Sequence, residues 1–279
     1  MPIAGALIVL SCAIWMTMDS IAKHLGRDYP VGQIVWARYA CSLVPMLAYA
    51  VATGRMRSMW VTRRPGVQLA RALFVLMSTY LVFGALKIIA LAQVTSIIFI
   101  SPIIVAVLAV LLLGEAMTPR RWLAVVLGFG GALLIIRPGF AGFQWALLIP
   151  VVAAVTRALY VLTTRALGKV DDPFTTLLYS AVFGSAVSSL VIVFDWRTPD
   201  PWGWSLMALL GLLGAISHFM MIRAYALAPS STLAPFTYAE LVWSVLFGIV
   251  LFGEVPDWLT IAGVVVIIAS GLTVLRASR

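Results

Sequence analysis

The chain alternates between long apolar runs and short polar stretches from one end to the other. A run of about 20 apolar residues is long enough to cross the hydrocarbon of a bilayer as an α-helix. A membrane β-barrel would instead need alternating apolar and polar residues in segments of about ten. The pattern therefore predicts an all-α polytopic membrane protein with ten transmembrane helices, at residues 3–24, 31–53, 68–89, 93–113, 119–137, 143–166, 173–195, 202–226, 230–252 and 255–276.

The composition of the chain fits a membrane protein better than a soluble one. Apolar residues make up 63% of its 279 residues and charged residues only 10%. Soluble domains have about 45–50% apolar and about 25% charged residues, so this chain has too few polar residues to cover a water-exposed surface. We therefore expect a lipid bilayer around it.

The charges predict an orientation. The net charge is +9, and most of the cations lie at the ends of apolar runs, so we expect them to set topology and expect no nucleic-acid partner. With the N-terminus inside, the inner loops and nearby helix ends, Arg71 included, hold about twice as many Lys and Arg as the outer ones. The prediction is a multi-pass protein of the cytoplasmic (inner) membrane with both termini in the cytoplasm.

Motifs of enzymes and metal sites are missing from the sequence. Cys12 and Cys41 lie in apolar runs, and no Cys or His has metal-ligand spacing, so we expect no metal and no cofactor. The sequence also has no phosphate-binding loop, no nucleophile elbow and no zinc-protease motif. ATP-driven transport and intramembrane hydrolysis therefore have no support.

Two long segments of the chain resemble each other. The segment ALAQVTSIIFISPIIVAVLAVLLLGE (90–115) parallels ALAPSSTLAPFTYAELVWSVLFGIVLFGE (226–254) in its Ala-Leu-Ala start, its proline and its Gly-Glu end. The two segments occupy corresponding places in the two halves of the ten-helix chain, so each repeated half contains five helices. Because five is odd, the second half must enter the membrane from the opposite side. The sequence therefore predicts two inverted five-helix repeats, 1–139 and 140–279.

These features, together with WARYACSLVPML (36–47), resemble the EamA-type transporters of the drug/metabolite transporter superfamily over nearly the whole chain. The resemblance implies ten helices in two inverted five-helix halves around a central cavity, and transport of a small metabolite. The opening WMTMDSIAKHL (15–25) is similar to that of members assigned to S-adenosylmethionine or riboflavin. One departure is Arg157, where second halves of the family often carry an aromatic residue.

Charged residues inside the apolar runs are candidate site residues, because ionisable groups are costly at membrane depth. Arg157 and Glu240 lie about nine and about ten residues from the inner ends of their predicted helices, which puts both near mid-membrane. We predict that they pair, or bridge through water or substrate. Glu240 would hold a proton or a substrate amine and Arg157 a carboxylate or phosphate; the alternative is a purely structural interhelical salt bridge.

A second candidate pair and two prolines concern structure and gating. The same estimate places Asp19 and Arg38 at the same depth in the membrane. We favour an ion pair between them that locks two helices together or forms part of an outer gate. Pro102 and Pro235 interrupt related helices and are candidate hinges.

Aromatic side chains within the predicted helices could form cavity walls that stack on a flat or cationic solute. Trp243 shares the helical face of Glu240 better than Tyr238 does, because it lies three residues on rather than two residues back. His218 could titrate, although a packing role is the alternative. The candidates are Trp15, Tyr80, Tyr160, Tyr238, Trp243 and His218.

The preferred function is secondary transport of a small polar or zwitterionic metabolite, with an amino acid or a related compound favoured and proton coupling through Glu240 as a hypothesis. A cofactor-like solute of the S-adenosylmethionine or riboflavin type is an alternative that the resemblance implies. A channel, or a membrane enzyme or assembly factor without solute flux, are alternatives of other classes. The direction of transport stays open, and either a monomer or a homodimer is compatible with the sequence.

Overall fold

The computed structural model describes residues 2–113, 119–136, 144–167, 170–227 and 236–276. These residues form a helical bundle and contain no β-strand. Short 3₁₀ turns precede α3 and α7. The α-helices are α1 (Pro2–Leu25), α2 (Val31–Ala52), α3 (Pro65–Leu86), α4 (Leu91–Ile98), α5 (Ser101–Leu113), α6 (Pro119–Ile136), α7 (Leu148–Leu167), α8 (Pro173–Ile192), α9 (Pro201–Leu227), α11 (Ala239–Phe252) and α12 (Trp258–Arg276).

Length and hydropathy divide the predicted membrane helices into two groups. In the described ranges, six helices are long and apolar enough to cross a membrane: α1, α2, α3, α7, α8 and α9. The other four predicted segments correspond to shorter apolar helices, over 91–105, 125–136, 239–252 and 258–270. The structure therefore supports a polytopic membrane protein with six clear apolar spans.

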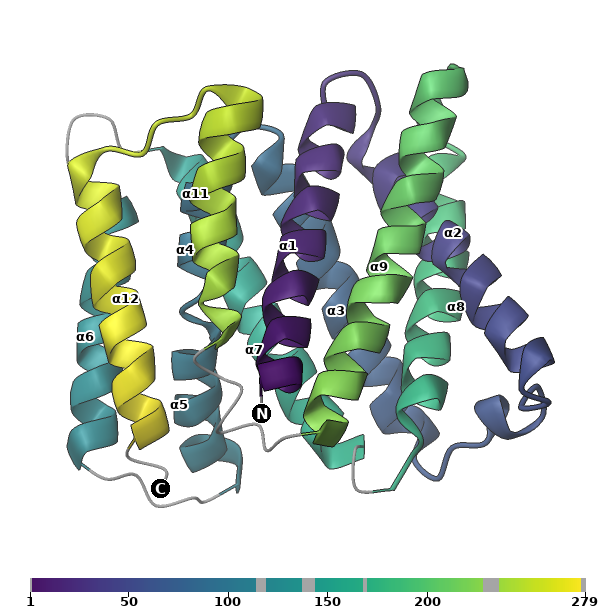
Figure 1. The fold of residues 1–279 in the computed structure, drawn as a ribbon, viewed down its shortest axis with the longest axis horizontal. Helices are drawn as coiled ribbons and strands as arrows, with labels where there is room; N and C mark the ends of the chain where they lie inside the picture. The colour runs from purple at the N-terminus through teal and green to yellow at the C-terminus, as the bar shows by residue number, and fades with distance from the viewer. Residues whose placement is uncertain (1, 114–118, 137–143, 168–169, 228–235, 277–279) are drawn as a thin grey trace.

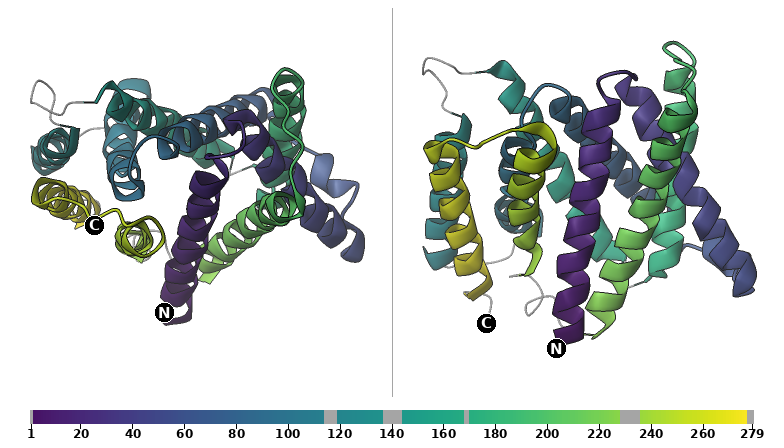
Figure 2. Two further views of the ribbon diagram at one scale, coloured as in Figure 1. Left: turned by 90° about the horizontal axis from the view of Figure 1, so that it is seen from above. Right: turned by 45° about the horizontal axis from the view of Figure 1, so that its top comes forward.

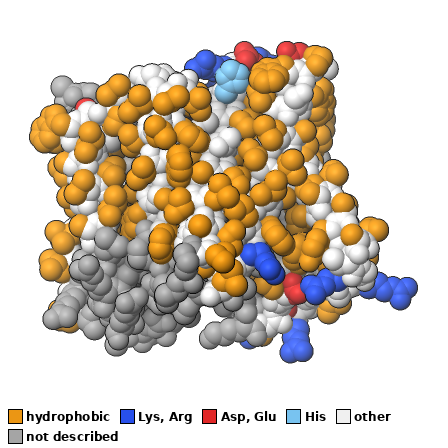
Figure 3. Space-filling model, viewed as in Figure 1, with side chains coloured by type: hydrophobic (Ala, Val, Ile, Leu, Met, Phe, Trp, Pro, Cys, Tyr) orange, Lys and Arg blue, Asp and Glu red, His pale blue; other side chains and the backbone are white. Residues whose placement is uncertain are grey.

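The helices lie side by side, and both chain ends lie at the lower end of the bundle in Figure 1. We call this end the termini face and the other end the opposite face. Seen from above, α6 and α12 lie together at one edge of the bundle (Figure 2). Apolar side chains cover the wall between the two ends, whereas most of the visible charged side chains gather at the ends themselves (Figure 3). Such an apolar band is what a bilayer requires.

Two glycines let α6 and α12 approach closely. A Cβ atom placed on Gly131 would lie 2.9 Å from the backbone oxygen of Gly263, and one on Gly263 would lie 2.6 Å from the backbone oxygen of Gly131. Small residues at a helix crossing allow this kind of backbone contact in membranes, where the hydrophobic effect does not drive helices together.

The predicted continuous helix 93–113 is wrong, because the segment is broken in two. α4 ends at Ile98, Phe99 and Ile100 form a turn, and α5 begins at Ser101. Pro102 is the second residue of α5, where a missing backbone N–H costs no helical hydrogen bond. It thus starts a helix instead of kinking one, and its hinge role stays a prediction.

A similar turn precedes α11. Tyr238 lies in a turn directly before Ala239, and its ring lies 5.5 Å from that of Phe99, between centroids. The two helix starts therefore meet inside the bundle. Pro235, the second predicted hinge, lies outside the described residues.

Candidate functional site

A cavity of about 120 Å³ lies between α1, α2, α3, α4, α7, α9 and α11. Its charged and titratable lining comes from five helices, as Asp19, Arg38, Arg157, His218 and Glu240. The cavity thus combines residues that are far apart in the sequence. All five are among the candidates that the sequence analysis names.

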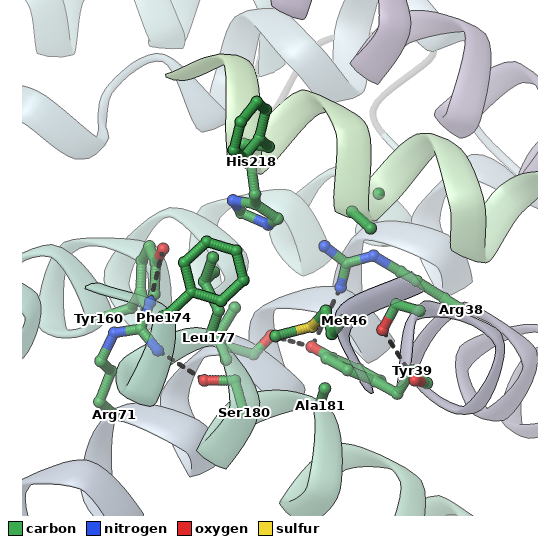
Figure 4. A pocket seen from close by; sticks show the side chains of 15 residues that line it. Arg38, Tyr39, Met46, Arg71, Tyr160, Phe174, Leu177, Ser180, Ala181 and His218 are labelled. Carbon is green, nitrogen blue, oxygen red and sulfur yellow. Dashed lines mark hydrogen bonds between the residues drawn. The ribbon is translucent and has the colours of Figure 1, made fainter. Parts of the chain in front are cut away.

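A second cavity of about 70 Å³ continues the first toward the termini face. The two share Arg38, Val75, Tyr160 and His218 in their walls. Figure 4 shows this second cavity, with Arg71 and Arg38 on either side of it and His218 at its edge. The shared walls make one chamber that runs from α11 to α8.

Glu240 owes its place to the start of α11. Its side chain is buried, and it lies in the first turn of the helix that begins at Ala239. The unpaired N–H groups at a helix N-terminus carry partial positive charge, which stabilises a carboxylate there. Because the turn at Tyr238 places a helix start here, the apolar segment can accommodate the carboxylate of Glu240.

The predicted pairing of Arg157 with Glu240 is confirmed. Arg157 Nη2 lies 3.8 Å from Glu240 Oε2, which is an ion pair but longer than a direct hydrogen bond. The Arg157 guanidinium also lies 5.9 Å from the centre of the Trp15 ring, and that ring meets His218 edge-on at 5.6 Å. The pair thus links α7 to α11 beside an aromatic wall from α1 and α9.

Asp19 and Arg38 line the same cavity but form no direct ion pair within the described part of the chain. Arg38 Nη1 donates instead to Thr79 Oγ1 at 2.6 Å and to Tyr39 Oη at 3.0 Å. The depth estimate placed the two charges level with each other, but depth does not determine which neighbour a side chain faces. The expected structural pair is absent from this conformation, and a gating role stays a prediction.

The aromatic candidates separate into two groups. Trp15 and Tyr160 line the cavity. Tyr238 contacts Phe99, and Tyr80 packs against the large core cluster. Trp243 packs beside α1 and α9, in a small cluster that contains Ile8, and does not line either cavity described above. The contacts of Trp243 therefore go to α1 and α9, and its predicted place in the cavity wall beside Glu240 stays a prediction.

Arg71 lines the chamber but was not among the predicted site residues. It is only 3% exposed and lines the second cavity, whereas we counted it with the topology-setting cations. Its Nη2 donates to Tyr160 Oη at 3.2 Å, and its guanidinium lies 4.7 Å from the centre of that ring. Further acceptors are Thr164 Oγ1 at 2.8 Å, Thr176 O at 3.0 Å and Ser180 Oγ at 2.5 Å. A signal was present, because Arg71 lies inside the apolar run and not before it.

At the opposite face, a half-buried ion pair joins α1 to the end of α11. Lys23 Nζ lies 2.7 Å from Glu254 Oε1 and also donates to Ile89 O at 2.5 Å. Glu254 Oε2 accepts from the backbone N–H of Leu91 at 2.9 Å. Gly253, with a φ of 68°, turns the chain out of α11 and so directs Glu254 toward this contact. The contact ties α1, α4 and α11 together above the cavity.

At the termini face, Asp171 joins the loop after α7 to the loop before α3. It accepts hydrogen bonds from Thr62 Oγ1 at 2.5 Å, from the Arg63 backbone N–H at 3.0 Å and from Gln68 Nε2 at 2.9 Å. Partial burial works against its ionisation, but these hydrogen bonds and the Arg63 charge outweigh that effect and hold the pKa of Asp171 below its usual range.

A family model and curated relatives match this chain to a transporter family, and a solved structure shares its fold. The model of the EamA-like transporter family matches residues 3–137 and again residues 144–276. An S-adenosylmethionine uptake transporter of Rickettsia prowazekii is 27% identical over 94% of this chain and 88% of its own length. A riboflavin transporter of Vibrio cholerae is 29% identical over 96% and 92%. A crystal structure of another protein has the same fold over 99% of both chains, with a TM-score of 0.71 and 19% identity.

Proposed function

The chain belongs to the EamA-like transporter family, and we propose that it is a secondary transporter that moves a small zwitterionic metabolite across the cytoplasmic membrane. The observation that carries the proposal is one cavity inside the bundle with charges of both signs, Asp19 and Glu240 against Arg38 and Arg157. Ionised groups at this depth are costly, so a chain retains them where function needs them. A zwitterion offers each of them a counter-charge.

The named relatives suggest which zwitterion to test first. S-adenosylmethionine, which the Rickettsia prowazekii relative takes up, carries an ammonium, a carboxylate and a sulfonium group on one side and a flat purine on the other. The charged residues suit the first part and the rings of Trp15 and Tyr160 suit the second. An amino-acid-bearing metabolite of this type is the substrate class that we propose.

A riboflavin-type solute is the second candidate. The aromatic wall of Trp15, Tyr160 and His218 favours it, because a flat ring system can stack there. The Vibrio cholerae relative is a riboflavin transporter. Riboflavin carries no charge at neutral pH, however, and so would leave the cavity charges without partners.

Alternating access by two inverted repeats, 1–139 and 140–279, is part of the proposal. Helix contacts support it, because each contact has a counterpart in which the two halves swap roles. α1 of the first half packs on α9 of the second, as α7 of the second half packs on α3 of the first. In the same way, α1 packs on α11 and α7 packs on α5. The starts of α5 and α11, each after a turn, would be related by the same exchange. Broken helices at the substrate site are typical of such carriers. Both termini would lie in the cytoplasm, as the Lys and Arg distribution predicts.

Proton coupling through Glu240 completes the proposal. A carboxylate that pairs with Arg157 in one state and is protonated in another would couple the ion pair to the proton gradient. Any uptake that remains in the Glu240→Gln variant should then not depend on that gradient. Transport by this variant that kept full proton dependence would remove Glu240 from the coupling step.

A thermal-shift screen on the purified protein tests the substrate class, because a ligand that binds the folded state raises its apparent stability. The panel contains S-adenosylmethionine, methionine, adenosine and riboflavin. We expect S-adenosylmethionine to give the largest shift, and a matched screen of Glu240→Gln to lose it. A shift with riboflavin alone would favour the second candidate, and no shift with any compound would favour a membrane enzyme or assembly factor.

A further inference from the structure

Arg38 presents a hydrogen-bonding edge that has no partner among the residues that the structure describes. Its Nη1 is held by Thr79 and Tyr39, and the Tyr39 ring lies 4.9 Å from the guanidinium carbon. Within the described residues, Nε is buried without an acceptor and Nη2 has none either. In a guanidinium group, Nε–H and one N–H of Nη2 point the same way and match the two oxygens of a carboxylate.

The other two arginines of the chamber are differently engaged. Arg157 is neutralised by Glu240, and the hydrogen bonds of Arg71 go to hydroxyl groups and a backbone carbonyl. Among the described lining residues, Arg38, Arg71 and Arg157 stand against Asp19 and Glu240 only. The chamber therefore holds one more cation than anion, with His218 taken as neutral.

The position of Arg38 is suited to a ligand. It lines both cavities, at the junction where His218 and Tyr160 also belong to both walls. Figure 4 shows Arg38 and Arg71 facing the same space from different helices. A group bound at Arg38 would thus lie in the passage between the centre of the bundle and the termini face.

We propose that Arg38 is a carboxylate-binding subsite of the transported solute, through the paired N–H groups of Nε and Nη2. This assignment rests on the proposed function and changes one part of the sequence-based hypothesis, which gave the carboxylate to Arg157. The cationic part of the solute then lies toward Asp19 and Glu240, and the solute spans the cavity. Tyr39 and Thr79 act as positioning residues, because they fix the guanidinium so that its second edge stays free.

The test compares probes that differ only in the carboxylate. Binding of S-adenosylmethionine and of its decarboxylated form, and of methionine and methioninamide, is measured by calorimetry on the full-length protein in detergent. Charge-assisted bidentate hydrogen bonds are strong, so the wild type should bind each carboxylate about ten- to a hundredfold more tightly than its partner probe. In Arg38→Gln this ratio should fall to about one, with the affinity for the decarboxylated probe unchanged.

Two further variants keep the test decisive. Arg38→Lys retains the charge but lacks the two-donor edge, so the ratio should fall at least about fivefold even if Arg38→Gln does not fold. Arg64→Gln removes an exposed cation outside the cavity and should leave the ratio as in the wild type. An unchanged ratio in both Arg38 variants would overturn the subsite while leaving the proposed function intact. Failure of all four probes to bind the wild type would overturn the proposed function and the subsite with it.

Discussion

The two ends of the chamber surround their arginines with different partners. At the α11 end, Arg157 meets a carboxylate 3.8 Å away, so its charge is balanced inside the protein. At the α2–α3 end, Arg38 and Arg71 bind hydroxyl groups and backbone oxygens, and no acidic side chain of the described chain pairs with them. The lesson is that the partner of a buried charge, and not its depth, indicates whether the charge is free for a solute.

Removing the carboxylate that pairs with Arg157 at the α11 end should have the largest effect on uptake and stability. Glu240→Ala leaves Arg157 without its counter-charge inside the bundle, which costs about 3 kcal/mol in a fully buried pair and less here, because Arg157 is partly exposed to the cavity. We expect solute uptake to fall by about a hundredfold or more and the melting temperature to drop. The double variant Glu240→Gln with Arg157→Gln should regain the melting temperature but not the uptake. Full uptake by the double variant would make the pair purely structural.

Removing a cation at the other end should mainly affect stability. Arg71 joins α3 to α7 and α8 through four hydrogen bonds, two of them to the buried residues Thr176 and Ser180, and Arg71→Ala removes all four. A hydrogen bond from a charged group contributes about 1.5–3 kcal/mol. We expect a clear loss of thermal stability in detergent, larger than for Arg64→Ala at the surface. A melting temperature equal to that of Arg64→Ala would show that Arg71 is not a structural link.

The ion pair at the opposite face allows a test of whether this contact closes the cavity toward that face. Glu254→Gln removes the ion pair with Lys23 and weakens the cap on the N-terminus of α4. In a background without Cys12 and Cys41, we expect Ser78→Cys, which lines the cavity, to be labelled several-fold faster from that face. The control is Asp195→Asn, an exposed carboxylate on the same side. Equal labelling in both variants would argue against a gate at Lys23–Glu254.

The smallest expected effect concerns Asp171, which links two loops on the termini face near Arg71. Because its pKa is lowered in the folded protein, it stabilises the fold above its unfolded pKa of about 3.9, and this contribution is lost as the pH falls through the folded pKa. We expect Asp171→Asn to lower the melting temperature at pH 6 by at most about 3 °C, because the group is largely solvated. The difference between the variant and the wild type should shrink below about pH 4. A difference that persisted at pH 3 would contradict this assignment.

Helix order and the central ion pair could be predicted from the sequence, because apolar run length and residue depth need no tertiary information. The break at Phe99 and Ile100 could not, since every residue of 93–113 is compatible with a continuous helix except Pro102. The partners of Arg38 and Arg71 were missed for another reason. Hydroxyl groups such as those of Thr79 and Ser180 neutralise no charge, and so they give no signal in a search for opposite charges.

Uptake of labelled S-adenosylmethionine into proteoliposomes measures whether the mixed-charge cavity binds and moves a zwitterionic solute. We expect saturable uptake that excess methionine reduces and that Glu240→Gln strongly lowers, while Arg64→Gln behaves as the wild type. Absence of saturable uptake for every zwitterion tried, or uptake by Glu240→Gln equal to that of the wild type, would contradict it.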